Sequence, residues 1–167
     1  MSKLLRHYQQ GNMYFITALT QDRKSILINY FGLLWQSINK YTDVLDFILI
    51  AYVILPDHLH LMINPKKGDP SAIMQKIKLS FSKKLKFERK GKHSKIRQRR
   101  FWDHVIGNDQ DMKNHIDYIH YNPVKHGYVV SPYEWQYSSF RKYFNNGMYS
   151  KDWGMRNNIK FSGEYGE

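Results

Sequence analysis

The chain has 167 residues, a length typical of one domain, and a formal net charge of +12. It contains no cysteine, which excludes disulfides, thiolate zinc sites and a cysteine nucleophile. No apolar run approaches the roughly 20 residues that span a bilayer, so we expect a soluble, cytoplasmic protein without a membrane partner. The excess of positive charge favours a polyanionic partner.

Hydrophobic periodicity divides the chain into strands and helices. Apolar runs and alternating patterns indicate strands, whereas apolar side chains at every third or fourth position indicate amphipathic helices. Pro56-Asp57 marks a tight turn, and Pro123 is expected to end the last helix because it disfavours helical geometry in the preceding residue. In chain order the expected elements are strand 13–19, helix 24–41, strands 46–54 and 58–64, helix 70–87, strand 100–106 and helix 109–122.

The order β-α-β-β-α-β predicts an α+β fold, a ferredoxin-like sandwich with two crossover helices on one sheet. A further helix and an aromatic-rich tail follow on the C-terminal side. We interpret this tail, which includes Tyr133 and Trp135, as a cover packed over the core. Residues 1–167 are therefore expected to form a single domain, with a core at about 13–143 and a C-terminal tail at 144–167.

Most of the net charge lies in one segment. Between Lys76 and Arg100 there are twelve Lys or Arg residues and one acid, Glu88. This density predicts contacts with nucleic acid, although a disordered or merely solvated basic loop is the alternative interpretation. The residues expected to hold the DNA backbone are Lys83, Lys84, Arg97, Arg99 and Arg100.

A pair of histidines is the first candidate for chemistry. His58 and His60 are two positions apart on a predicted strand, so their side chains share one face, while Leu59 points to the other. Two adjacent imidazoles can share a metal ion, but taken alone such a pair is more often solvated or buried in a core. The histidines without a pairing pattern are interpreted as structural or surface residues: His93, His104, His120 and His126.

The helix predicted over 109–122 supplies the second candidate. Tyr118 and Asn122 are one turn apart, on a face roughly opposite the apolar stripe. A phenol can act as a covalent nucleophile and an Asn carbonyl can bind a hard metal, whereas Tyr121 and Tyr128 lack a ligand-type residue four positions on. From this helix alone, a surface tyrosine remains the more frequent interpretation. The sequence contains neither a P-loop nor a G-x-S-x-G nucleophile turn.

Two motifs resemble a known family. AYVILPDHLHLMINP (51–65) is similar to the His-hydrophobic-His strand of the IS200-like single-tyrosine (HUH) transposases, and HIDYIHYNPVKHGYV (115–129) is similar to their nucleophile helix. RRFWDHVI and EWQYSSF resemble the branch associated with repetitive extragenic palindromes (REP). The resemblance covers roughly residues 13–143. Leu55 and Asp57 depart from the commoner Met and Asn beside the proline, which are conservative changes.

The resemblance implies a specific activity. It implies a metal-dependent enzyme that nicks and joins single-stranded DNA at hairpins or palindromic repeats, through a 5′-phosphotyrosine and a free 3′-hydroxyl. Carried over, Tyr118 is the nucleophile, and the ligands of Mg²⁺ or Mn²⁺ are His58, His60 and Asn122. Asn122 stands where the smaller mobile branch usually has Gln. The REP-associated branch looks domesticated and monomeric, so the resemblance favours a monomer over a homodimer.

Two other functions stay open at this point. A domesticated module could hold DNA hairpins without cleaving them, and an RNA-binding protein could use the same sheet architecture. The second lacks the aromatic strand signature K/R-G-F/Y-G/A-F-V-x-F/Y. The complete set of His58, His60, Tyr118 and Asn122 favours the enzyme over the binding module.

Overall fold

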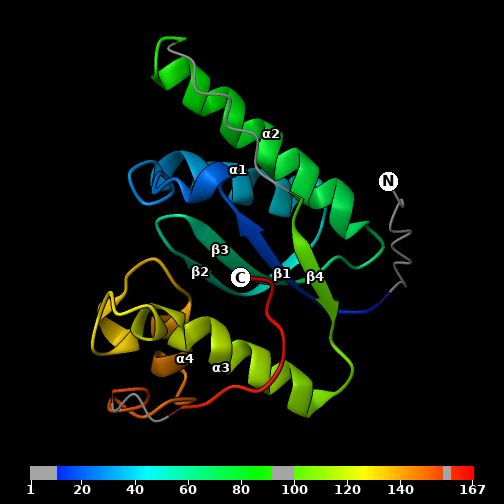
Figure 1. Cartoon of the computed structure of the whole chain (residues 1–167). Coiled ribbons are helices and arrows are strands. Elements are labelled where there is room, and N and C mark those ends of the chain that lie inside the picture. The colour runs from blue at the N-terminus through cyan, green and yellow to red at the C-terminus, as the bar shows by residue number, and fades with distance from the viewer. Residues whose placement is uncertain (1–10, 92–99, 156–158) are drawn as a thin grey trace.

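The computed structural model describes residues 11–91, 100–155 and 159–167. Within these residues one antiparallel sheet has the strand order β2-β3-β1-β4 (Figure 1). Its strands are β1 (Tyr14–Leu19), β2 (Ile48–Ile54), β3 (His58–Asn64) and β4 (Trp102–Val105). Because each crossover helix links two strands that enclose a third, this is the split β-α-β arrangement of a ferredoxin-like fold. The predicted α+β class is therefore confirmed.

Helices cover both faces of the sheet. In Figure 1, α1 and α2 lie on one side and α3 with the short α4 on the other. Their bounds are α1 (Phe31–Val44), α2 (Pro70–Glu88), α3 (Asp109–Lys125) and α4 (Phe140–Asn145), with 3₁₀ turns at Gln21–Arg23 and Pro132–Glu134. Among the described residues, no helix is both long and apolar enough to cross a bilayer.

Alternation along β3 assigns its side chains to the two layers. Leu59, Leu61 and Ile63 belong to the core formed with α1 and α2, whereas Met62 belongs to the core formed with α3. His58 and His60 have the parity of Met62 and therefore face α3. Both imidazoles are buried, because the strand lies in the interior of the sheet with a helical layer on each side.

The first helix begins later than its periodicity predicts. We expected it over 24–41, but α1 starts at Phe31. Leu27 is buried and its backbone N–H donates to the Pro56 carbonyl (2.9 Å), which ties this part of the chain to the β2–β3 turn. Tertiary hydrogen bonds here replace those that a helix would make, while the spacing of apolar residues still resembles a helix.

The last long helix continues past its expected end. We expected Pro123 to stop it at Asn122, but α3 runs to Lys125 with Pro123 inside. Proline removes one helical hydrogen bond, and here it does so close to the end of the helix. The final turn is closed by the His126 N–H, which donates to the Asn122 carbonyl (3.0 Å). The extension keeps Lys125 on the helical face of Tyr118, seven positions and two turns away.

The aromatic segment after α3 packs over the core, as predicted. The Trp135 indole N–H donates to the Ile54 carbonyl (3.0 Å), and Ser138 forms an isolated bridge with Val53 of β2. Phe140 is fully buried. The segment therefore runs along β2, and Ser139 Oγ, 2.8 Å from His120 Nε2, joins it to α3.

Candidate active site

The structure brings together the four side chains predicted to carry the chemistry. His58 and His60 project from β3 with ring centroids 5.1 Å apart and ring planes at 84°. The Tyr118 ring of α3 lies 5.4 Å from that of His60. Asn122 follows one turn later on the same helix, and all four side chains are at most 2% exposed. The expectation that Tyr118 lies on a face outside the core was wrong, because its ring packs against Phe15 and His60 of the sheet and is covered by Tyr165.

The carboxylate of Glu167 lies at the centre of these four residues. Its Oε1 accepts hydrogen bonds from the Tyr118 hydroxyl (2.5 Å) and from Asn122 Nδ2 (2.9 Å). The same oxygen lies 2.9 Å from His60 Nε2 and 3.6 Å from His58 Nε2. In chemical terms Oε1 stands in for an anionic, acceptor-only oxygen of the kind that a phosphate presents.

The other oxygen of Glu167 is held by two side chains at the end of α3, those of Lys125 and His126. Oε2 lies 2.6 Å from Lys125 Nζ and 3.2 Å from His126 Nε2. Lys125 Nζ also donates to the Tyr118 hydroxyl (2.7 Å). Burial alone would raise the pKa of Glu167, yet its contacts with His126, His58, His60 and Lys125 hold that pKa well below its usual range. The site therefore stabilises a negative charge at this position.

Residues 159–167 form the outer wall of the site. Tyr165 stacks on Tyr118 with ring centroids 3.6 Å apart and planes at 8°, and Phe161 meets Tyr118 edge-on. Gly166 has a φ of +75°, and a Cβ there would lie 2.7 Å from Trp102, so only glycine fits this path. Burial, and then the hydrogen bond to Glu167, raise the pKa of Tyr118 far above its ordinary value. In this arrangement Tyr118 is a neutral phenol.

Hydrogen bonds behind each imidazole determine which nitrogen faces the site. Thr17 Oγ1 donates its only proton to the Tyr165 carbonyl (2.5 Å), so it can only accept from His60 Nδ1 (2.8 Å). The Asp57 carboxylate likewise accepts from His58 Nδ1 (2.7 Å). Burial lowers the pKa of His60 to about 4, so this ring is neutral at pH 7. Held in this way, His60 presents the Nε2 lone pair to the site, as metal-ligating histidines do, and His58 Nε2 points to the same place.

Unpaired polar atoms at the site also fit a divalent cation. His58 Nε2 and Asn122 Oδ1 are buried and have no hydrogen-bond partner among the described residues. Leaving such an atom unpaired costs on the order of 1–3 kcal/mol. Two imidazole nitrogens and an amide oxygen are suitable ligands, and the oxygen ligand favours hard ions such as Mg²⁺ or Mn²⁺.

A second histidine cluster differs in geometry. His104 Nε2 and His115 Nδ1 lie 2.9 Å and 3.0 Å from the carboxylate of Asp111. The two rings, however, are stacked 4.6 Å apart with planes at 13°, so their in-plane lone pairs run side by side and do not converge. This cluster links β4 to α3 through hydrogen bonds, in agreement with the structural role expected of His104.

Comparison with known proteins identifies the chain. Residues 9–122 match the family described as "Transposase IS200 like". This chain belongs to the IS200-like transposase family. The matched region includes the histidine pair, Tyr118 and Asn122, and it ends before Lys125 and Glu167.

Relatives place this transposase in the REP-associated branch. One relative, which bears the name of a REP-associated tyrosine transposase, comes from Haemophilus influenzae. It is 39% identical to this chain over 98% of this chain and 99% of the relative's own length. The REP-associated tyrosine transposase of Escherichia coli is 34% identical over 92% of this chain and 91% of its own. A solved REP-associated tyrosine transposase bound to a REP hairpin has a TM-score of 0.82 and 30% identity, covering 100% of this chain and 94% of that one. The predicted family and branch are confirmed, and the protein is a tyrosine transposase.

Several contacts of the transposase site were missed by sequence reasoning. His126 was interpreted as structural or surface, yet it lies beside Glu167. Lys125 could have been found from its spacing to Tyr118, had the helix been extended through Pro123. Glu167 carries no local signal, because its contacts span 107 positions to His60 and 45 to Asn122.

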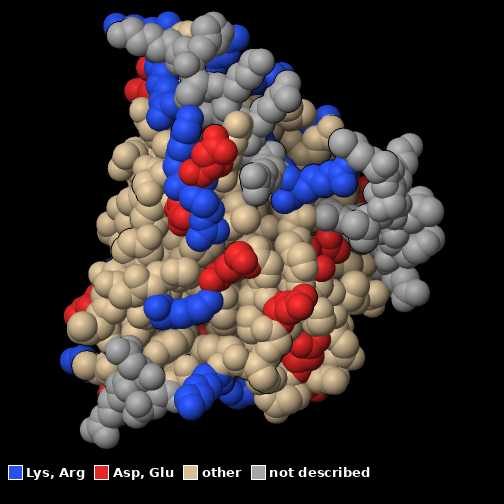
Figure 2. Space-filling model, in the orientation of Figure 1, with Lys and Arg blue, Asp and Glu red and all other residues tan. Residues whose placement is uncertain are grey.

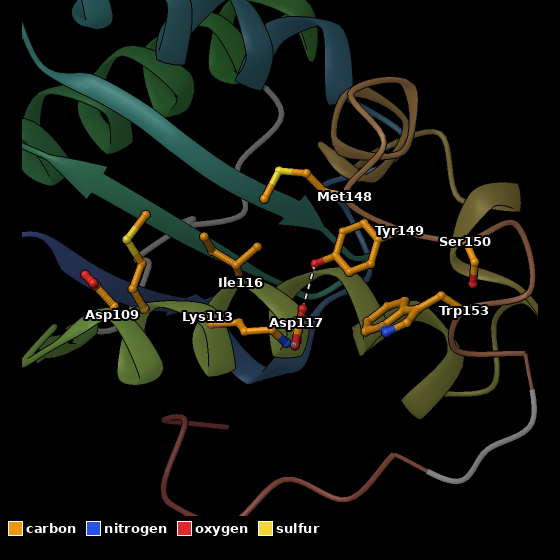
Figure 3. A pocket seen from close by; sticks show the side chains of 9 residues that line it. Asp109, Lys113, Ile116, Asp117, Met148, Tyr149, Ser150 and Trp153 are labelled. Atoms are coloured by element: carbon orange, nitrogen blue, oxygen red, sulfur yellow. Dashed lines mark hydrogen bonds and ion pairs between the residues drawn. The ribbon is translucent and has the colours of Figure 1, made fainter.

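A cavity of about 550 Å³ on the opposite side of α3 is separate from this site. Figure 3 shows it between α3 and the segment 148–153, with the Tyr149 hydroxyl donating to Asp117 (2.8 Å). His120 Nδ1 lies 2.9 Å from the same hydroxyl, and burial lowers the pKa of His120 to about 3. A neutral, hydrogen-bonded His120 ties α3 to the segment that follows α4, which matches its expected structural role.

Basic residues of the transposase gather along the outer helix. Figure 2 shows Lys and Arg side chains concentrated over α2. Near its end Lys83, Lys86 and Lys90 line a surface depression together with Phe87, whose side chain is 87% exposed. Of the other residues expected to contact DNA, Lys84 is half-buried, with Nζ donating to the Gln36 side chain (3.1 Å), and Arg100 is exposed. Arg97 and Arg99 lie outside the described residues.

Proposed function

We propose that this transposase cleaves and rejoins single-stranded DNA at REP-type hairpins, through a covalent bond between Tyr118 and a 5′-phosphate. One observation carries the proposal. The Tyr118 hydroxyl, the Asn122 amide and the Nε2 atoms of His58 and His60 meet at a single anionic oxygen of Glu167. The similarity to a transposase bound to a REP hairpin supports the choice of substrate.

In the proposed reaction a DNA phosphate takes the place of the Glu167 carboxylate. Tyr118 Oη attacks phosphorus, the bond from phosphorus to the 3′-oxygen breaks, and the phosphate stays on Tyr118 as a 5′-phosphotyrosine. The phenol proton passes to solvent, and the departing 3′-oxygen takes up a proton. Attack by a 3′-hydroxyl on the phosphotyrosine reverses these steps and reseals the strand without ATP.

The side chains around Tyr118 have distinct parts in this reaction. Lys125 Nζ, 2.7 Å from the hydroxyl, stabilises the phenolate once Glu167 has left. His58, His60 and Asn122 would hold the divalent ion, Mg²⁺ or Mn²⁺. When bound, such an ion polarises the phosphate and offsets the charge that develops on it. Thr17 and Asp57 keep the two imidazoles oriented for that task.

A covalent trapping experiment tests the proposal. A labelled REP-type hairpin with single-stranded flanks is incubated with the protein and Mn²⁺ or Mg²⁺ and then separated on a denaturing gel. We expect a protein–DNA adduct that survives denaturation, disappears on chelation, and yields a peptide with a 5′-phosphate on Tyr118. Cleavage without an adduct would contradict the mechanism. Hairpin binding without cleavage would instead indicate a non-cleaving DNA-binding module.

The basic end of α2 predicts a salt-dependent contribution to DNA binding. Changing Lys83, Lys86 and Lys90 to Gln should reduce the slope of log affinity against log salt by about 2. Each phosphate neutralised on a single strand contributes roughly 0.7 to that slope. The measurement is hairpin binding by fluorescence anisotropy over a range of salt concentrations. A control variant with the same loss of charge carries Gln at Lys142, Lys151 and Lys160. If the control changes the slope as much, the effect follows net charge and does not place the DNA on α2.

A further inference from the structure

We propose that Glu167 is itself a metal ligand, so that His58, His60 and Glu167 hold a divalent ion together when no DNA is bound. The inference rests on the proposed metal site and adds a ligand beyond the family's matched region, which ends at residue 122. It assigns Glu167 a binding role in addition to filling the place of the phosphate.

The atoms around Glu167 Oε1 include the Nε2 atoms of both histidines. Thr17 Oγ1 and the Asp57 carboxylate contact the Nδ1 atoms of His60 and His58, so the Nε2 atoms of both rings are the ones that point toward Oε1. Oε1 of an ionised carboxylate is an acceptor. With the ring protons on the Nδ1 atoms, both Nε2 atoms and Oε1 are acceptors, and a cation lying between them would satisfy all three. Among the described residues, His58 Nε2 is buried and has no hydrogen-bond partner, as expected of an atom left for a cation.

The spacing of these three atoms also fits a single metal ion. Ligands bound about 2.1 Å from one ion lie about 3.0 Å apart when neighbours in an octahedron and about 3.4 Å apart in a tetrahedron. Oε1 lies 2.9 Å from His60 Nε2 and 3.6 Å from His58 Nε2, which spans this range. The imidazole planes are at 84°, so their in-plane lone pairs can meet at one point, unlike those of the stacked pair formed by His104 and His115.

The Glu167 carboxylate is already held in position by contacts of its own. Lys125 and His126 hold Oε2 and thereby turn Oε1 toward the histidines. The backbone before Glu167 is fixed by the hydrogen bond from Thr17 to the Tyr165 carbonyl and by the close packing of Gly166 on Trp102. A ligand held in this way loses little conformational entropy when it binds an ion. In the free protein Glu167 thus occupies the coordination position that a DNA phosphate would take.

The affinity for Mn²⁺ in the absence of DNA tests this inference. Calorimetric titration of the full chain is compared with the same titration of Glu167→Gln. We expect the variant to bind Mn²⁺ at least tenfold more weakly, which corresponds to about 1.4 kcal/mol. Glu164→Gln, an exposed acid of the same segment, is the matched control and should bind like the parent. If Glu167 only fills the ion's place, Mn²⁺ must displace it, and Glu167→Gln will bind as tightly or more tightly.

Hydrogen exchange of residues 159–167 provides a second readout. Mn²⁺ should slow exchange in this segment if Glu167 is a ligand and accelerate it if the ion displaces Glu167. Gly166→Ala, which keeps the carboxylate but obstructs its path over Trp102, should weaken Mn²⁺ binding in the same direction as Glu167→Gln. The parent and Glu167→Gln could bind Mn²⁺ equally tightly while covalent adducts still form. That result would overturn this inference and leave the proposed function standing. Absence of both Mn²⁺ binding and adducts overturns both.

Discussion

Replacing Tyr118 by Phe is expected to abolish the protein–DNA adduct, with a loss of cleavage of roughly 10⁴-fold or more, because the substitution removes the nucleophile itself. The Tyr118 ring is buried and stacks on Tyr165, and both contacts are available to phenylalanine. The hydroxyl bonds to Glu167 and Lys125, and these two remain paired with each other when it is removed. Folding stability should therefore change by only about 1 kcal/mol. Denaturing gels measure the adduct, and anisotropy shows that hairpin binding persists.

Two other tyrosines provide controls for that experiment. Tyr121 is buried against Trp153 and Phe161, and Tyr128 is half-exposed beyond the end of α3. Tyr121→Phe and Tyr128→Phe should each keep the adduct, because neither hydroxyl contacts Glu167 or the histidine pair in the structure. An adduct formed by Tyr118→Phe would refute the assignment and make Tyr121 the next nucleophile to test.

Shortening the chain to end at residue 158 should accelerate adduct formation by about tenfold to a hundredfold when Mn²⁺ is saturating. Glu167 competes with the DNA phosphate, and residues 159–167 bury the nucleophile. Burial and the bond to Glu167 both raise the pKa of Tyr118, and each unit by which that pKa falls gives about ten times more phenolate at a fixed pH. The pH at which the rate rises should therefore be lower in the shortened chain. Initial rates on the labelled hairpin, measured across pH, test both expectations.

The concentration of the ion separates competition at the site from the loss of a ligand. At limiting Mn²⁺ the shortened chain should be slower than the full chain, since it lacks Glu167 as a ligand, and at saturating Mn²⁺ it should be faster. Glu164→Gln should behave like the parent under both conditions. Thermal unfolding of the shortened chain shows whether it still folds, and Glu167→Ala provides a smaller change if it does not. A slower rate even at saturating Mn²⁺ would mean that Glu167 assists the chemistry.

Local patterns were sufficient for the relations that lie within one element. The two-residue period of β3 places His58 and His60 on one face, and the helical period of α3 places Tyr118 one turn from Asn122. The order of strands and helices was enough to predict the ferredoxin-like sheet, because a β-α-β-β-α-β chain with right-handed crossovers has few other ways to close.

Contacts between distant segments were decided only by the tertiary structure. The burial of Tyr118 depends on Tyr165 and the wall formed by residues 159–167, and the path of that wall requires Gly166 against Trp102. The start of α1 and the helical turn through Pro123 follow from tertiary packing that overrides local propensity. Glu167 reaches His60 across 107 positions, and no periodicity in a sequence encodes a contact of that kind. Sequence patterns specify which side chains share a face, whereas only the packed chain specifies what lies opposite them.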